Sequence, residues 1–234
     1  MKTRLAVFDI DGTLYDGNLG ISFVKYLVAQ KVFDPKIEKN ILSLYGDYKQ
    51  NKIEKGVATK MIYQLYAEGL KNKTKQEVIR FAKNCWSEAK RDIFDFTKPL
   101  IKCFEDKNHL VILLSGSPSE LVNLFAKEHG IILSNTASGR EEIINDKYTG
   151  RSMSNLGSAQ EKIAALRKIV EDKKINIDWA DSFGMGDNER DVKILEKTGH
   201  SVAFEPNEVL KKISAKRGWH IADRTSVLRL AETF

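Results

Sequence analysis

A short apolar run that ends in two carboxylates is the feature that most constrains how this chain folds. Residues 5–8 (LAVF) are continuously apolar, which is typical of a buried parallel strand, and residues 9–13 (DIDGT) follow at once. Ligands of open α/β folds bind at the carboxyl ends of strands, so Asp9 and Asp11 are expected to face a crevice. Asp-Gly is also a hairpin signal, but the next segment has helical periodicity where a hairpin needs a return strand.

The rest of the chain alternates short apolar segments with amphipathic ones. Strands are expected at residues 110–114, 131–133, 181–185 and 201–204, and helices at 120–129, 161–172, 190–197 and 209–217. Such alternation is typical of βα units on a parallel sheet, so we predict an α/β, Rossmann-like core. Residues 136–149 contain Gly139 and Asn145-Asp146 and are expected to form a hairpin or a short excursion.

A long helical segment interrupts this pattern near its start. From Gly20 to about residue 95 apolar residues recur at helical spacing, and no strong strand signal separates them. We therefore expect a helical cap domain at residues 16–95, inserted into a catalytic core of residues 1–15 and 96–234. The length of 234 residues fits one large domain, or a domain with an insertion, at about 150 residues per domain.

Composition excludes several classes of protein. A hydrophobic fraction of 42% with 30% charged residues suits a globular chain, and no apolar run approaches the roughly 20 residues of a membrane-spanning helix. The first apolar run is too short for the core of a signal peptide. Cys85 and Cys103 form no CxxC pair, and the four histidines lack zinc-site spacing. We expect a cytoplasmic protein with reduced thiols and no membrane partner.

The net charge of +6 admits an acidic partner such as nucleic acid. The lysines and arginines are scattered, however, and many stand beside Asp or Glu. A mixed, solvated surface explains this pattern, so no nucleic-acid partner is expected.

A second acidic segment follows the strand expected at 181–185. Asp191 comes four residues after Asp187, so one helical turn could aim both carboxylates at one pocket. The alternative is that Asp187 or Asn188 only caps the next helix, and the segment alone does not decide between them. Gly184 and Gly186 fit neither common phosphate-loop pattern.

A serine-rich turn connects another strand to a helix. Ser117 and Glu120 predict a capping box, with Pro118 at the first helical position. The Ser115 hydroxyl and the Gly116 amide are then left at the sheet edge, where donors near a helix N-terminus suit a phosphate. A turn without a ligand remains the alternative.

In order and position these segments resemble the four motifs of the haloacid dehalogenase-like phosphatase superfamily. The matching residues are DIDGT at Asp9–Thr13, the turn at Ser115, Lys162, and GDNERD at Gly186–Asp191. Lys162 on its own would be read as a solvated lysine. The helical segment resembles the cap of the phosphoserine phosphatase-like branch, so the resemblance covers essentially the whole chain.

The resemblance implies a role for each of these residues. Asp9 would be the nucleophile that forms an aspartyl-phosphate, and Asp11 would protonate the leaving group and later activate water. Bringing a carboxylate to ~3.5 Å from one negative charge costs roughly 5 kcal/mol at an effective dielectric constant near 20, so a cation is required. This cation would be Mg²⁺, held by Asp9, Asp187 and the carbonyl of Asp11. The phosphate would be bound by Ser115, Gly116 and Lys162. Thr13 and Asp191 would be supporting residues.

The expected function is a Mg²⁺-dependent phosphatase of a small phosphorylated metabolite. Dehalogenating members of the superfamily lack the second aspartate, so Asp11 favours phosphoryl transfer. Phosphoserine phosphatases carry a glutamate where this chain has Asn18, and Gly116-Ser117 and Arg190 also depart from their pattern. Free phosphoserine is therefore not the expected substrate. The alternatives are a phosphotransferase or mutase, and a non-catalytic binding protein on the same fold.

Overall fold

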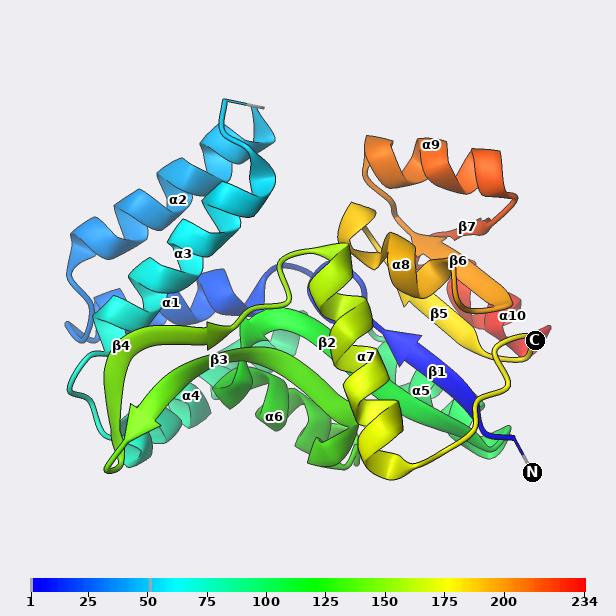
Figure 1. The fold of residues 1–234 in the computed structure, drawn as a ribbon, viewed down its shortest axis with the longest axis horizontal. Helices are drawn as coiled ribbons and strands as arrows, with labels where there is room; N and C mark the ends of the chain where they lie inside the picture. The colour runs from blue at the N-terminus through cyan, green and yellow to red at the C-terminus, as the bar shows by residue number, and fades with distance from the viewer. Residues whose placement is uncertain (1, 51) are drawn as a thin grey trace.

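The computed structural model describes residues 2–50 and 52–234, apart from the side chains of Lys49 and Lys55. Within these ranges seven strands form one sheet in the order β4-β3-β2-β1-β5-β6-β7 (Figure 1). Neighbouring strands run parallel except β3 and β4, which confirms the α/β class with a mainly parallel sheet. The strands are β1 (Arg4–Phe8), β2 (His109–Pro118), β3 (Thr136–Ile144), β4 (Lys147–Ser154), β5 (Phe183–Gly186), β6 (His200–Phe204) and β7 (His220–Ala222).

Helices precede, connect and follow these strands. In the long segment between β1 and β2 they are α1 (Leu19–Ala29), α2 (Pro35–Lys49), α3 (Lys55–Leu70), α4 (Lys75–Ala89), the 3-10 helix η1 (Lys90–Asp92) and α5 (Thr97–Asp106). After β2 they are α6 (Ser119–Glu128), η2 (Leu133–Asn135), α7 (Ala159–Lys173), η3 (Glu189–Asp191), α8 (Val192–Leu195), α9 (Glu208–Arg217) and α10 (Val227–Glu232).

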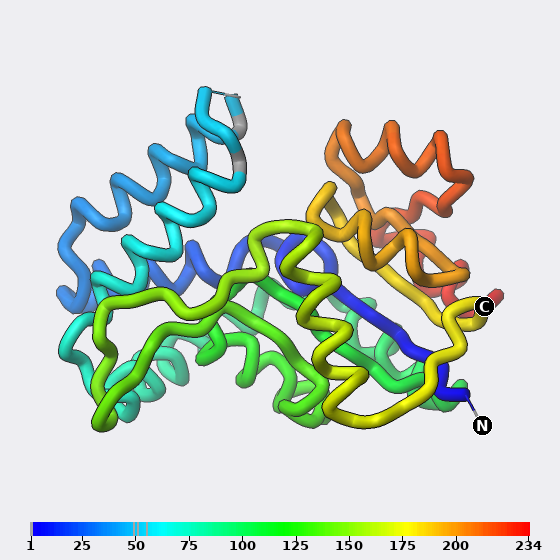
Figure 2. Tube along the Cα trace, in the orientation of Figure 1, coloured from blue at the N-terminus to red at the C-terminus, as the bar shows by residue number. Residues whose placement is uncertain are grey.

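Side-chain alternation along β1 explains why both faces of the sheet are covered. Ala6 and Phe8 face a core shared with α1, α4, α5, α6 and α10, whereas Leu5 and Val7 face a second core formed with α7. A strand that is buried on both faces must be continuously apolar, as the sequence of β1 is. β1 therefore lies in the middle of the sheet between β2 and β5, and its carboxyl end is central as well (Figure 2).

The four helices α1–α4 do not have a core of their own. Their large buried side chains belong to the same apolar cluster as the helices beneath the sheet, and Trp86 of α4 packs against Phe125 of α6. The antiparallel pair α2 and α3 rises from this layer beside the hairpin of β3 and β4 (Figure 1). The described residues of 16–95 therefore do not pack as a separate unit, and their role as a cap over a site stays a prediction.

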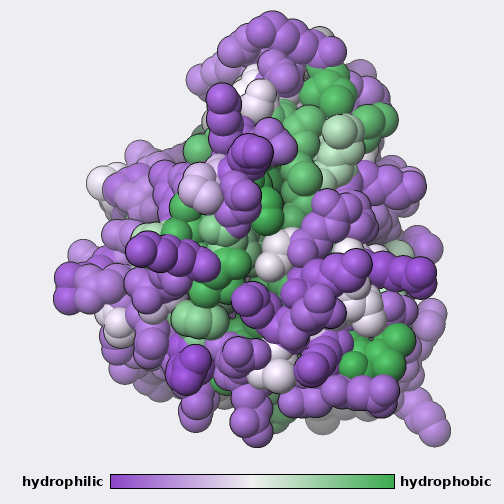
Figure 3. Space-filling view, turned by 90° about the vertical axis from the view of Figure 1, so that its left-hand side faces the viewer, coloured by the Kyte–Doolittle hydropathy of each residue, from purple (hydrophilic) through white to green (hydrophobic). Residues whose placement is uncertain are grey.

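On the side that carries α2, α3 and β4, hydrophobic residues form a band bordered by hydrophilic ones (Figure 3). Exposed apolar side chains on these elements include Leu42, Val57, Met61 and Met153. No helix in the described ranges combines the length and the apolar character needed to cross a membrane.

One strand prediction was wrong. Residues 131–133 are not a strand: α6 ends before Gly130, which has a φ of +72°, and Ile132 and Leu133 are exposed. The strand begins at Thr136, the first residue of this segment that pairs with Leu113 of β2. The apolar residues therefore predicted a strand in this part of the chain, but the position of the strand depends on which residue pairs with Leu113 of β2.

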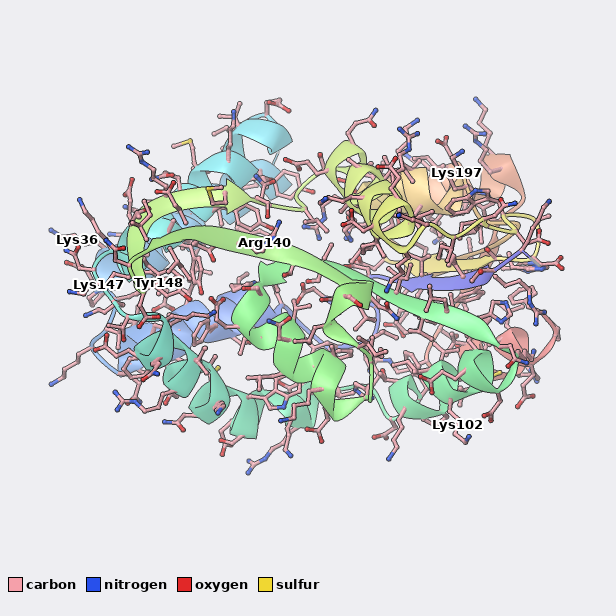
Figure 4. The ribbon with its side chains drawn as sticks, turned by 60° about the horizontal axis from the view of Figure 1, so that its bottom comes forward. Lys36, Lys102, Arg140, Lys147, Tyr148 and Lys197 are labelled. Atoms are coloured by element: carbon pink, nitrogen blue, oxygen red, sulfur yellow. The ribbon has the colours of Figure 1, made fainter. Side chains whose placement is uncertain are left out.

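Two other segments differ from expectation in length or were not foreseen. The helix expected at 190–197 is the 3-10 turn η3 followed by the short α8, and the edge strand β7 and the last helix α10 had no prediction. By contrast, 136–149 lies in a true hairpin, because Asn145 and Asp146 both adopt positive φ between β3 and β4. Tyr148 lies near that turn and Arg140 farther along the hairpin (Figure 4).

A buried acidic pair lies where this hairpin meets α6. Both carboxylate oxygens of Glu141 are buried without a hydrogen-bond partner among the described residues, and Tyr148 donates its hydroxyl proton to Glu120. Burial, together with the charge of Glu120, raises the pKa of Glu141 to about 8. The unfolded chain has a glutamate pKa of about 4.3, so between these values only the folded protein retains the proton.

We therefore expect the unfolding free energy to fall as pH rises through this window, by up to about 1.4 kcal/mol per pH unit. Glu141→Gln, which mimics the protonated acid, should flatten this dependence: its Tm should match that of the wild type at about pH 3.5, below the pKa of the unfolded chain, and exceed it at pH 8.5. Thermal unfolding followed by circular dichroism checks this. Glu171→Gln, at an exposed position on α7, is the control and should leave the pH profile unchanged. Parallel profiles for wild type and Glu141→Gln would contradict the assignment.

Candidate functional site

Asp9 follows β1 directly and forms a buried ion pair. Its Oδ1 atom lies 2.8 Å from Nζ of Lys162, in the first turn of α7, and Lys162 lies 2.6 Å from Oδ1 of Asp191. Burial alone would lower the pKa of the Lys162 ammonium, but the charges of Asp191 and Asp9 outweigh it, so the pKa is raised. Lys162 is 1% exposed, so the reading of this residue as a solvated lysine does not apply.

The second oxygen of Asp9 is available for chemistry. Oδ2 is buried and has no hydrogen-bond partner among the residues that the structure describes. An unpartnered carboxylate oxygen in a buried position costs free energy, so its presence at the end of a central strand indicates a place for a ligand or a cation.

Asp11 is held by three donors from two elements. Its Oδ1 accepts a hydrogen bond of 2.7 Å from the amide of Leu19, the first residue of α1. Its Oδ2 accepts from the hydroxyls of Ser115, at 2.7 Å, and Ser117, at 2.8 Å. A carboxylate offers about four acceptor positions, so one on Oδ1 remains for a proton. This carboxyl group is therefore oriented and still able to exchange a proton.

Ser117 does not form the expected capping box. α6 begins at Ser119 with Pro118 as its N-cap residue and without a side-chain cap, because β2 continues as far as Pro118. The hydroxyl of Ser117 instead donates to Asp11 and accepts from the amide of Gly20 at 2.9 Å. The sequence did not reveal this site residue, because a capping box is visible in the local sequence whereas a contact between residues about one hundred positions apart is not.

Ser115 and Gly116 lie beside Ser117 on the same strand end. The Ser115 hydroxyl accepts from the amide of Ser117 at 2.9 Å while it donates to Asp11. The carbonyl of Gly116 accepts a hydrogen bond of 2.5 Å from the Tyr63 hydroxyl of α3. The structure thus brings the Ser115 turn to Asp11 and links it to the helical segment.

Asp187 follows β5, the strand beside β1. Carboxylate oxygens of Asp9, Asp187 and Asp191 lie within 4.8 Å of one another. Burial, and then the charges of Asp9 and Asp191, raise the pKa of Asp187 well above its usual value. The helix-capping alternative applies to Asn188, whose side chain accepts from the amide of Arg190, so Asp187 is left for the site.

This donor set fits a divalent cation. The three carboxylates crowd together beside one lysine, and Asp9 has one buried oxygen, Oδ2, without a partner among the described residues. Hard cations such as Mg²⁺ take oxygen ligands from carboxylates and carbonyls, so the excess negative charge and the ligand type agree. Both oxygens of Asp191 already accept hydrogen bonds, Oδ1 from Lys162 and Oδ2 from the amide of Asn188. Asp9, whose Oδ2 is free, and Asp187 are therefore the better placed side-chain ligands.

Two glycines permit this close approach of carboxylates. Gly12 has a φ of +79°, and a Cβ atom there would lie 2.8 Å from Oδ2 of Asp187. A Cβ atom at Gly186 would lie 2.3 Å from Cγ of Asp191. Thr13, in contrast, contributes through its backbone to the turn, and its buried hydroxyl has no partner among the described residues.

Arg190 is a further site residue to which sequence reasoning gave no role. Its Nε donates to Oδ1 of Asn188 at 2.8 Å, and its side chain borders a cavity beside Asp11 and Ser117. Burial opposes the charge of Arg190, but the three clustered carboxylates outweigh it and raise its pKa. Its position between Asp187 and Asp191 in the sequence was the available signal.

The fold and the site can now be compared with known proteins. The model of the haloacid dehalogenase-like hydrolase family matches residues 6–196. The phosphoserine phosphatase SerB1 of Mycobacterium tuberculosis is 24% identical over 228 residues, which cover 94% of this chain and 71% of that protein. A crystal structure of a protein with unknown function from Bordetella pertussis superposes with a TM-score of 0.80 at 19% identity, over 96% of this chain and all of that one. A phospho-aspartyl intermediate analogue of phosphoserine phosphatase superposes with a TM-score of 0.68 at 19% identity, over 96% of this chain and 94% of that one.

Proposed function

The chain belongs to the haloacid dehalogenase-like hydrolases, and from that premise we propose that it is a Mg²⁺-dependent phosphatase that acts through an aspartyl-phosphate on Asp9. The observation that carries the proposal is the free, buried Oδ2 of Asp9 beside Lys162 and beneath an oriented Asp11. The substrate is a small phosphorylated metabolite, as the names of phosphatase relatives also suggest.

Asp9 is the nucleophile in this proposal. Its carboxylate oxygen attacks phosphorus while the bond between phosphorus and the ester oxygen breaks. Lys162 holds the other oxygen of Asp9 and so directs the free Oδ2 toward the substrate. Asp191 fixes Lys162 from the opposite side and acts as a positioning residue.

Asp11 is the acid and base. It gives its proton to the departing alcohol oxygen in the first step, and takes a proton from the water that attacks the phosphorylated Asp9 in the second. The hydrogen bonds from Leu19, Ser115 and Ser117 keep its carboxyl group in place for both transfers.

The phosphoryl group is bound by the strand end of β2 and by cations. The amide of Gly116 is proposed to donate to it, and Lys162 to neutralise part of its charge. The Ser115 hydroxyl has one proton, which it donates to Asp11 in this structure, so it would donate to the phosphoryl group only in exchange for that bond. When bound, Mg²⁺ would supply the remaining positive charge between nucleophile and phosphate, held by Asp9, Asp187 and the carbonyl of Asp11.

The helical segment at residues 16–95 is proposed to act as the cap over this site. Tyr63 of α3 bonds to Gly116, and Tyr48 of α2 donates to Oε1 of Glu189 at 3.1 Å. These contacts from α2 and α3 bring the segment onto the ends of β2 and β5. A cover of this kind excludes bulk water and strengthens the electrostatic interactions beneath it.

The experiment that tests the function measures both products. With Mg²⁺ present, the protein should release inorganic phosphate and alcohol from p-nitrophenyl phosphate in a one-to-one ratio. The assay is repeated with a second alcohol added as a possible acceptor. If p-nitrophenol is then released in excess of inorganic phosphate, the phosphoryl group has been transferred to the added alcohol, which would support a phosphotransferase instead. Absence of either product would contradict the proposed activity.

A further inference from the structure

A cavity leads away from the site beneath the helical segment. Its volume is about 110 Å³, and its end near the core is formed by Asp11, Ser117 and Arg190. The remainder lies between α1, α2 and α3. The apolar side chains of its wall include Ile21, Val24, Ile41 and Ile62. Because the cavity opens at the acid Asp11, its occupant during catalysis is the alcohol part of the phosphate ester.

The charges of the wall are confined to the phosphoryl end. Among the described residues that line the cavity, Asp11 and Arg190 are the ones with charged side chains. Arg190 belongs to the acidic end: burial opposes its charge, but the neighbouring charges of Asp9, Asp187 and Asp191 outweigh burial and raise its pKa. Asn18 also borders the cavity, but its Oδ1 accepts from the amide of Ile21 and caps α1. Among the described side chains, the walls formed by the helices therefore offer no oppositely charged partner for a charged group on the alcohol.

The tyrosines of the wall support the same conclusion. Tyr63 and Tyr66 line the cavity from α3, and burial raises the pKa of both, so they are neutral at physiological pH. The Tyr66 hydroxyl is buried and has no hydrogen-bond partner among the residues described here. An unpartnered hydroxyl in a cavity wall can serve one polar, uncharged atom of a ligand.

From these observations, and resting on the proposed phosphatase function, we infer that the substrate is the phosphate ester of an uncharged, mainly apolar alcohol about the size of one ring. The volume of about 110 Å³ lies somewhat below the roughly 150 Å³ of an apolar cavity that accommodates benzene, which makes one ring the upper limit for the alcohol. An ammonium or carboxylate in this cavity would lose its hydration without gaining an oppositely charged partner among the described helix residues, so zwitterionic alcohols such as serine are disfavoured. Arg190 and Ser117 mark the boundary between the phosphoryl end and this alcohol pocket.

The charge requirement is tested with two esters of equal size. n-Propyl phosphate and 2-aminoethyl phosphate differ by a methyl group in place of an ammonium group. The ammonium makes its alcohol the better leaving group, so intrinsic reactivity works against the expected order. We expect kcat/KM to be at least tenfold higher for the propyl ester, and higher again for benzyl phosphate. A preference for 2-aminoethyl phosphate or for phosphoglycolate, which carries a carboxylate, would overturn the inference.

The location of the pocket is tested by filling it. Ile62→Phe should lower kcat/KM for benzyl phosphate at least tenfold and change that for methyl phosphate less than threefold. Met61→Phe is the matched control, because Met61 is 45% exposed and lies outside this cavity, and it should change neither value. If Ile62→Phe unfolds, as judged by its Tm, Ile21→Phe fills the same cavity from α1. Equal losses for both esters, or none, would overturn the location.

The two proposals fail in different ways. If no ester, including p-nitrophenyl phosphate, releases phosphate with Mg²⁺ present, the phosphatase function fails and this inference fails with it. If p-nitrophenyl phosphate is hydrolysed but charged alcohols are preferred, only the substrate class is wrong.

Discussion

Asp9→Asn should reduce phosphate release from p-nitrophenyl phosphate by at least about a thousandfold, since a neutral amide is a very weak nucleophile. Asp9 is 4% exposed, and its Oδ2 has no competing partner among the described residues, so the substitution acts on the reacting atom. Steady-state kinetics give the rate. Acid quenching with ³²P-labelled substrate should trap label on the wild-type protein and none on the variant.

The same variant distinguishes a chemical effect from a structural one. Lys162 keeps its contact with Asp191 when Asp9 is neutral, so the site is not left with an unpaired buried lysine. The Tm of Asp9→Asn should therefore remain within a few degrees of the wild type. Asp172→Asn removes an exposed carboxylate of α7 and should retain full activity. Activity of Asp9→Asn within tenfold of the wild type would contradict the nucleophile assignment.

Removal of the divalent cation should have the second large effect. Chelation with EDTA should lower activity by at least about a hundredfold, and added Mg²⁺ should restore it, because the negatively charged nucleophile and phosphate repel each other without a cation. Asp187→Asn should show a comparable loss and should no longer respond to Mg²⁺ at millimolar concentration. Full activity of the wild type in EDTA would contradict the metal assignment.

Stability gives a second measurement of the same site. The Asp187 pKa is raised by burial and by the neighbouring carboxylates, so its ionised form is unfavourable in the folded protein at neutral pH. Without Mg²⁺, Asp187→Asn should therefore unfold at a higher temperature than the wild type. Mg²⁺ should raise the Tm of the wild type and leave that of the variant unchanged, with Asp172→Asn behaving like the wild type. If Asp187→Asn has a lower Tm than the wild type in EDTA, repulsion among the carboxylates of Asp9, Asp187 and Asp191 does not destabilise the metal-free protein.

Particular elements show how far sequence reasoning reached. The core strands were predicted well because a strand buried on both faces is apolar throughout, as β1 is. Residues 131–133 were misread because apolar composition does not specify a pairing partner, and the partner of Leu113 is Thr136. The family membership and the phosphatase class predicted from the motifs are confirmed, whereas the roles of Asp9, Asp11 and Asp187 stay predictions.

The sequence by itself determined the strand that carries Asp9 and Asp11, the α/β class and the order of the chemical groups along the chain. These depend on local patterns: an apolar run, helical periodicity, and short motifs at strand ends. Only the tertiary structure decided that Ser117 turns toward Asp11 and that Arg190 borders a mainly apolar cavity. Such contacts join residues about one hundred or more positions apart, and they depend on how the helices pack over the sheet. No local pattern encodes that packing, which is why the site chemistry was readable in advance and the shape of the pocket was not.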